Sequence, residues 1–266
     1  FFGAAPNAGM KRVDCPLVHE ENGRYGIDFE QFEATINEQT AMFLLCNPHN
    51  PVGRVFRRDE LEKMAELCLR HGVPICSDEI HSDLVFPGHT HLPIAALDPE
   101  VEKNCITLIA PSKTFNIAGL ECSAAIIPDE GLRKRYDEAR RGLVGWVNQL
   151  GISAGLAAYR EGQDWLEELI NYLQGNRDYL HDFLLREMPG VQMSPVEGTY
   201  LAWLDCRPVG LKEKPAEYFW KKARVGLNEG ESFGAEGAGF VRLNFGCPRS
   251  LLTEGLKRMA RSLFEG

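Results

Sequence analysis

Hydrophobic residues along the first half of the chain form two kinds of pattern. Continuous apolar runs predict strands at residues 40–46, 73–76, 105–109 and 122–127, and the first run is typical of a strand buried on both faces of a sheet. Between the first two runs, apolar side chains recur at helical spacing: Leu61, Met64, Ala65, Cys68 and Leu69. Strands that alternate with helices indicate an α/β fold, a mostly parallel sheet covered by helices.

The pattern changes after residue 162. A long helix is predicted over 163–188, followed by strands at 198–204 and 239–245 that flank a helix at 215–224. A last amphipathic helix carries Leu252, Leu256, Met259 and Leu263.

We therefore expect two domains. Residues 1–162 form a large domain, and residues 163–266 form a bridging helix and a smaller C-terminal α+β domain. The chain begins Phe1-Phe2-Gly3 without an initiating Met, so we expect the N-terminal part of the large domain to be absent from it.

Polar side chains stand where three of the predicted strands end. Asn50 follows the first strand, Asp78 the second, and Ser112-Lys113 the third. Ligands of parallel sheets collect at the carboxyl ends of the strands, so these positions predict a binding site.

Five ordered motifs carry a resemblance to a known family. They are the stretches that begin with Asn47-Pro48-His49-Asn50, Ser77-Asp78-Glu79-Ile80, Pro111-Ser112-Lys113-Thr114, Glu197-Gly198-Thr199-Tyr200 and Val241-Arg242-Leu243-Asn244. Together they resemble the class I/II aminotransferase superfamily, and within it they are most similar to the MalY/PatB-type cystathionine β-lyases. The resemblance covers essentially the whole chain and implies the cofactor pyridoxal 5′-phosphate (PLP).

The resemblance assigns a role to each polar residue at the strand ends. It implies that Lys113 binds PLP as a Schiff base and is catalytic, that Asp78 pairs with the pyridine nitrogen, that Asn50 and His81 contact the ring oxygen O3′, and that Ser112 contacts the phosphate. Four of these residues also have a purely structural interpretation. Lys113 would be a surface lysine, Asp78 a helix cap, Asn50 a turn residue, and His81 a structural histidine.

Two basic residues compete for the substrate carboxylate. Arg242 lies in an apolar strand, and its guanidinium matches a carboxylate with two hydrogen bonds; Arg249 is the rival. The phosphate site departs from the superfamily pattern, because Ala110 and Glu121 stand where relatives often carry serine and arginine. Tyr200 and Trp203 either shape the pocket or belong to the core.

The function expected from these residues is a carbon–sulfur β-lyase that acts on cystathionine or related cysteine S-conjugates. It would release pyruvate, ammonia and a thiol. An aminotransferase could use the same residues, and a non-catalytic regulatory protein could keep the same PLP fold. The resemblance also implies a homodimer with sites at the subunit interface and an amino-acid substrate.

Net charge and cysteine usage limit the expected binding partners and cellular location of the protein. A net charge of -9 argues against a nucleic-acid or acidic-membrane surface, and no apolar stretch reaches transmembrane length. The eight cysteines stand singly, mostly in apolar runs, which favours reduced thiols in a cytoplasmic protein. His81, Asp83, His89 and His91 could suit zinc, but their spacing matches no metal signature, so we expect no metal site.

Overall fold

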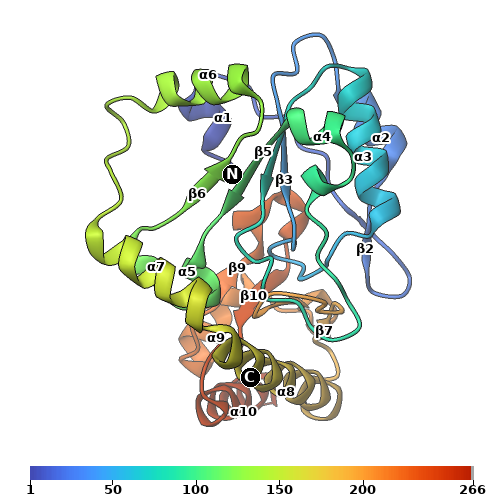
Figure 1. The fold of residues 1–266 in the computed structure, drawn as a ribbon. Helices are drawn as coiled ribbons and strands as arrows, with labels where there is room; N and C mark the ends of the chain where they lie inside the picture. The colour runs from blue at the N-terminus through green and yellow to red at the C-terminus, as the bar shows by residue number, and fades with distance from the viewer. Residues whose placement is uncertain (265–266) are drawn as a thin grey trace.

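A computed structural model describes residues 1–264 (Figure 1). Its larger sheet has the strand order β3 (Phe43–Cys46), β4 (Ile75–Asp78), β5 (Cys105–Ile109) and β6 (Ala124–Ile126). Strands β3, β4 and β5 are parallel, and β6 is antiparallel to β5. This arrangement confirms the predicted α/β class with a mostly parallel sheet.

Helices α2 (Phe29–Thr35), α3 (Arg58–Arg70) and α4 (Pro99–Lys103) pack on one face of this sheet (Figure 1). The apolar positions of α3 bury Leu61, Met64 and Cys68 against β3, β4 and β5, as their helical spacing predicts. The amide of Arg57 donates to the Glu60 carboxylate, which satisfies a free donor at the start of α3.

The prediction that the first strand is buried on both faces is wrong for β3. Phe43 and Leu45 join the cluster under α2 and α3, whereas Leu44 points to the opposite face and is 37% exposed. Successive side chains of a strand alternate between faces, and within residues 1–264 β3 lies at the edge of the sheet. The run of apolar residues therefore did not distinguish one covered face from two.

Helices α2 and α4 were not predicted from the sequence, and neither were α6 (Glu130–Arg140) and α7 (Gln149–Glu161). Helices α6 and α7 begin at capping side chains, since Asp129 accepts from the amide of Leu132 and Asn148 from that of Gly151. The remaining short elements of this half are α1 (Ala4–Asn7), the hairpin β1 (Val18–His19) and β2 (Tyr25–Gly26), α5 (Pro111–Thr114), and 3₁₀ helices at Ile94–Ala96 and Ala118–Leu120.

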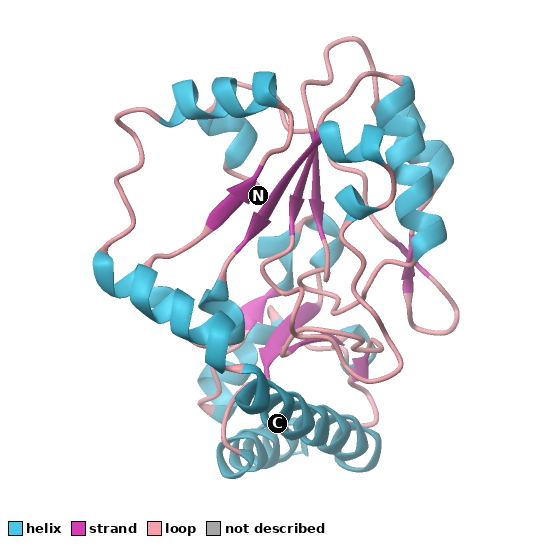
Figure 2. Ribbon diagram, in the orientation of Figure 1, coloured by secondary structure: helices cyan, strands magenta, loops and turns pink. Residues whose placement is uncertain are grey.

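The second sheet is antiparallel, in the order β7 (Gln192–Met193), β8 (Leu201–Asp205), β10 (Phe240–Asn244) and β9 (Asn228–Glu229). Helices α8 (Gln163–Glu187), α9 (Pro215–Ala223) and α10 (Arg249–Phe264) pack against it, and Figure 2 shows them grouped below the larger sheet. The predicted long helix therefore forms over the expected residues. No helix within residues 1–264 is both long and apolar enough to cross a bilayer.

The buried side chains form two main clusters. One lies between the parallel sheet and α3, and the other surrounds α8, β8, β10 and α10. Leu84 and Phe86, from the first half of the sequence, belong to the second cluster. We propose that the two clusters are the cores of two domains, 1–162 and 163–266, with the segment around Leu84 packed across the boundary.

Candidate active site

The parallel strands deliver the predicted residues to one edge of the larger sheet. Asp78 is the last residue of β4 and pairs in register with Cys46, the last residue of β3. Asn50 lies in the loop after β3, and Lys113 lies in α5, which follows β5. Their convergence follows from topology, because parallel strands share a carboxyl edge.

Arg242 reaches this edge from the second sheet. Its Nη1 donates to Asn50 Oδ1 at 2.8 Å, and its Nη2 donates to Asn228 Oδ1 at 2.8 Å. The guanidinium lies 4.7 Å from the centre of the Phe233 ring, a cation–π distance. Its Nε is buried and has no hydrogen-bond partner within residues 1–264. Burial lowers the pKa of Arg242, because desolvation disfavours the charged form, and an anionic ligand beside it would offset that cost.

His81 lies beside these groups and is only 5% exposed. Burial, together with the positive charges of Lys113 and Arg242, lowers its pKa to about 4. The imidazole is therefore neutral near pH 7. Its ring meets that of Tyr200 edge to face, with centres 6.1 Å apart. This contact brings Tyr200 to the site, whereas Trp203 stacks on Phe240 in the core.

Asp78 is a half-buried carboxylate without a cationic side chain of its own. Its Oδ1 accepts from the amide of Ile80 at 3.2 Å, and it forms no salt bridge within residues 1–264. Burial raises the pKa of Asp78, while the Ile80 amide and the charge of Lys113 act in the opposite direction. Lys113 is likewise half-buried and forms no salt bridge with the described residues.

The phosphate side of the site has fewer groups. Ser112 is half-buried in α5, and its carbonyl accepts from the amide of Ile117. Glu121 is exposed and has a left-handed backbone with φ 52°. An acidic side chain repels a phosphate, so the position that often holds arginine in the superfamily contributes no cation here.

The four residues considered for zinc have separate neighbours. Asp83 accepts from the Thr114 hydroxyl at 2.9 Å, His91 Nε2 pairs with Glu79 at 2.8 Å, and His89 lies 3.9 Å from Glu197. His81 instead faces Tyr200. Across residues 1–264, no three His, Cys, Asp or Glu side chains gather as metal ligands.

The rival arginine lies elsewhere. Arg249 Nε donates to Asn176 at 2.7 Å, and its guanidinium packs over Tyr179 of α8. It therefore stabilises the start of α10 against α8. Sequence reasoning missed Asn228, the second partner of Arg242, because nothing in its local pattern marks it.

The gathered side chains fit a pyridoxal phosphate. They are an amine, a carboxylate that lacks a cationic partner among the described residues, an amide, a neutral imidazole and a guanidinium with an unpaired Nε. Those are the groups that would bind the aldehyde, the protonated ring nitrogen, the ring oxygen and a substrate carboxylate.

Comparisons with known proteins agree with this chemistry. A family model described as aminotransferase class I and II matches residues 4–259. Cystathionine beta-lyase PatB of Bacillus subtilis is 42% identical over 266 residues, which cover 99% of this chain and 68% of PatB. Protein MalY of Escherichia coli is 35% identical over 260 residues, which cover 96% of this chain and 66% of MalY.

A solved structure also matches. The crystal structure of cystalysin from Treponema denticola, which contains a pyridoxal 5′-phosphate cofactor, has a TM-score of 0.96 at 36% identity. The match covers 100% of this chain and 68% of that one. The chain belongs to the class I and II aminotransferase family of PLP-dependent enzymes, in the part of it that resembles PatB and MalY.

Proposed function

We propose that the protein is a PLP-dependent carbon–sulfur β-lyase that converts cystathionine or related cysteine S-conjugates to pyruvate, ammonia and a thiol. The convergence of Lys113, Asp78 and Arg242 at one sheet edge carries this proposal. The similarity to PatB over 99% of the chain supports the choice of reaction.

The side chains divide the work. Bound PLP supplies an electron sink for the substrate Cα. Arg242 binds the α-carboxylate with a guanidinium fork, and the Arg242–Asn50 hydrogen bond of 2.8 Å orients that fork. Because Asn50 accepts through Oδ1, its Nδ2 group remains available to donate to the ring oxygen.

Lys113 holds the cofactor and moves protons. Its primary amine stands on a flexible stem and would form the carbon–nitrogen bond to the cofactor. With cofactor and substrate bound, its amine would be the group that accepts the substrate Cα proton. Asp78 keeps the ring nitrogen protonated, because an opposite charge favours the cationic form. His81, neutral near pH 7, offers a hydrogen bond without adding a competing charge. Ser112 contributes a hydroxyl to the phosphate.

The decisive assay is product analysis. PLP-loaded protein incubated with cystathionine should release pyruvate and ammonia in equal amounts, with no amino acceptor added. Formation of a keto acid only when an amino acceptor is present would overturn the lyase and favour an aminotransferase. The family description itself gives that alternative its weight. A binding role without chemistry would survive replacement of Lys113 by Ala, whereas lyase activity would not.

We propose further that two copies of the chain form a homodimer. Apolar side chains are exposed on and before α7, including Leu150, Leu156 and Trp146, of which Trp146 is 93% exposed. Monomers rarely leave such surfaces in water. Light scattering of the wild type should give the mass of a dimer. The double variant Trp146→Glu/Leu150→Glu should give the mass of a monomer. A monomeric mass for the wild type would contradict the proposal.

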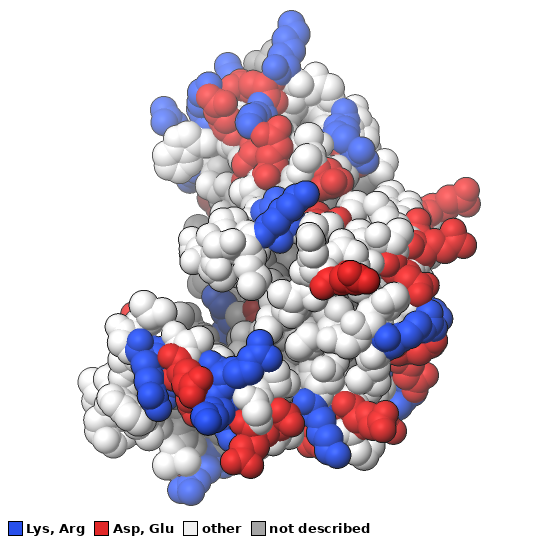
Figure 3. Space-filling view, turned by 90° about the horizontal axis from the view of Figure 1, so that it is seen from above, with Lys and Arg blue, Asp and Glu red and all other residues white. Residues whose placement is uncertain are grey.

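Two further proposals concern the setting. The substrate is a small amino acid. On the face of the molecule shown in Figure 3, acidic and basic side chains are interspersed. A cytoplasmic location is supported by the eight cysteines, all of them free thiols. Fractionation of cells that express the protein would test the location.

A further inference from the structure

The hydrogen bond between Arg242, which we propose binds the substrate carboxylate, and Asn50 joins two distant parts of the chain. Asn50 lies in a loop of the larger domain, and Arg242 lies in β10 of the second sheet, 192 residues later. Their 2.8 Å hydrogen bond therefore depends on how the loop is held against that sheet.

One short segment makes the connection. The amides of Glu197 and Gly198 both donate to the carbonyl of Gly53, at 2.7 and 2.9 Å, just after the Asn50 loop. Gly53 has φ 73°, and a side chain there would meet Val196 at 3.0 Å, so the two backbones are in close approach. The same segment continues directly into β8, which is paired in register with β10.

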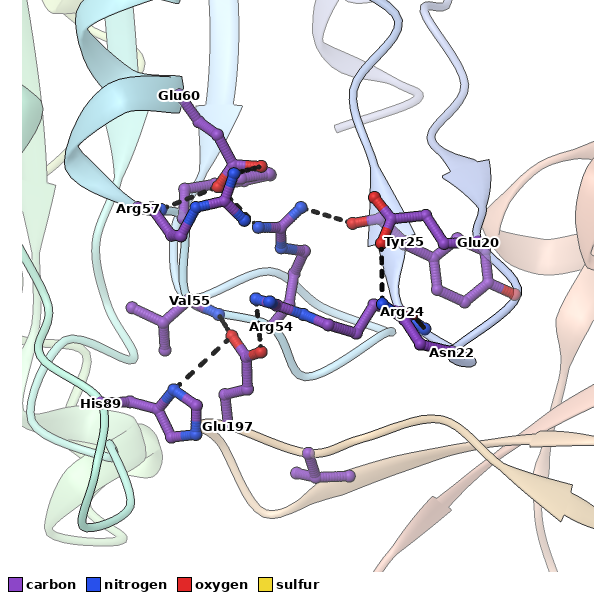
Figure 4. A network of polar contacts seen from close by, with 12 residues as sticks. Glu20, Asn22, Arg24, Tyr25, Arg54, Val55, Arg57, Glu60, His89 and Glu197 are labelled. Atoms are coloured by element: carbon purple, nitrogen blue, oxygen red, sulfur yellow. Dashed lines mark hydrogen bonds and ion pairs between the residues drawn. The ribbon is translucent and has the colours of Figure 1, made fainter.

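The Glu197 side chain adds a second anchor (Figure 4). Its Oε2 accepts from the amide of Val55 at 2.9 Å, and its Oε1 pairs with Arg24 Nη2 at 2.7 Å. The carboxylate is almost wholly inaccessible, since Glu197 is 4% exposed. His89 approaches it at 3.9 Å from a third segment. A buried carboxylate costs free energy unless it is paired and hydrogen-bonded, and here both conditions are met.

A neighbouring pair fixes the same stretch from the other side. Buried Arg54 donates to Glu60 of α3 at 2.6 Å and to the carbonyl of Tyr25. The hairpin that contains Arg24 and Tyr25 thus contacts Arg54 in the stretch that follows Asn50 and Glu197 in the segment that leads into β8. In Figure 4 these groups converge on the loop, between the hairpin and the segment that leads into β8.

We propose that Glu197 is a positioning residue for the substrate-carboxylate site, with Arg24 as its charge partner, an inference that rests on the proposed function. Glu197 touches neither Arg242 nor Asn50 directly. It holds the end of the Asn50 loop against the strand that pairs with β10, and so keeps the Arg242 fork aimed at the site. Its loss should weaken recognition of the carboxylate and leave attachment of an amine to the cofactor unaffected.

Two small probes separate these effects. Glycine carries an amine and a carboxylate but no side chain to eliminate, whereas methylamine lacks the carboxylate. Binding of each to PLP-loaded protein is followed by the visible absorbance of the cofactor. Glu197→Ala should raise the dissociation constant of glycine about tenfold, as expected for loss of a charge-assisted hydrogen bond, and that of methylamine less than about twofold. Equal weakening of both probes, or of neither, would overturn the proposal.

Matched variants guard against a general loss of folding. Arg24→Gln leaves the Glu197 charge buried without its partner and should weaken glycine binding more than Glu197→Gln does. The double variant Arg24→Gln/Glu197→Gln should bind glycine more tightly than Arg24→Gln alone. Arg12→Gln removes an exposed ion pair with Asp14, 2.9 Å long, and should change neither probe. A double variant as weak as the sum of the singles would contradict the pairing.

Hydrogen exchange on cofactor-free protein gives a second measurement. Glu197→Ala should speed exchange of amides in residues 47–56 and 240–244 and leave those of α8 unchanged; uniform or absent change would count against the proposal. The outcomes also separate this inference from the proposed function. A wild-type protein that binds glycine selectively yet forms no pyruvate would refute the lyase while leaving the role of Glu197 supported.

Discussion

Protonation of His81 should make the stability of the protein fall with acid in a measurable way. Burial lowers the pKa of His81 from 6.5 to about 4. Between those pH values the unfolded chain binds more protons than the folded one, so the free energy of unfolding rises with pH there. The stabilisation is fully present above about pH 6.5 and is lost as the pH falls toward 4.

The magnitude follows from the pKa difference. A difference of about 2.5 pKa units corresponds to about 3 kcal/mol once the loss is complete, and about 2 kcal/mol of it is lost on going from neutral pH to pH 5. Buried His49, whose pKa burial and the nearby Arg54 also lower to about 4, adds a contribution of the same sign.

Urea unfolding of the wild type and of His81→Gln, each at pH 7.5 and pH 5, measures this contribution as a difference of differences. The variant should lose about 2 kcal/mol less than the wild type on acidification. His181→Gln is the control, because that side chain is half exposed on α8 and its removal should leave the pH dependence unchanged. A His81→Gln protein that keeps the full pH dependence would refute the account of a buried neutral imidazole.

Three further predictions concern other substitutions. Asp78→Asn should retain PLP but lower kcat for pyruvate release by at least about a hundredfold, because a neutral amide no longer stabilises the protonated ring; unchanged kcat would exclude that role. Arg242→Lys should raise KM for cystathionine by about tenfold or more through loss of the two-pronged contact, and an unaltered KM would move carboxylate binding elsewhere. Leu180→Ala, in the buried face of α8, should cost about 2–5 kcal/mol in urea unfolding, whereas exposed Leu185→Ala should cost under about 1 kcal/mol.

The elements with a clean hydrophobic period were predictable. The helix expected at 163–188 forms at Gln163–Glu187, because its leucines repeat at helical spacing through most of its length. Helix α7 escaped prediction for a physical reason. It packs through Gly151 and Gly155, which approach the Leu120 carbonyl and Cys122, while its large apolar side chains face outward. Its hydrophobic pattern therefore does not indicate a helix with one buried face. The Asn148 cap was the available sequence signal for the start of the helix.

Some features of the candidate site could likewise be predicted from the sequence, and others could not. Asn50, Asp78 and Lys113 were predictable because each stands where a parallel strand ends. The contact of Arg242 with Asn50 depends on how the second sheet packs against the loop after β3, and no local pattern encodes it. The role we propose for Glu197 was also beyond the sequence, since its partners Arg24 and Val55 come from two separate segments.

The central claim is that Lys113 binds the cofactor, and borohydride reduction tests it most directly. Borohydride converts a lysine–cofactor link to a stable amine, after which digestion and mass spectrometry locate the modified residue. The account predicts that the added mass falls on the peptide containing Lys113 and disappears in Lys113→Ala. Modification of another lysine, or none in protein that has been incubated with PLP, would contradict it.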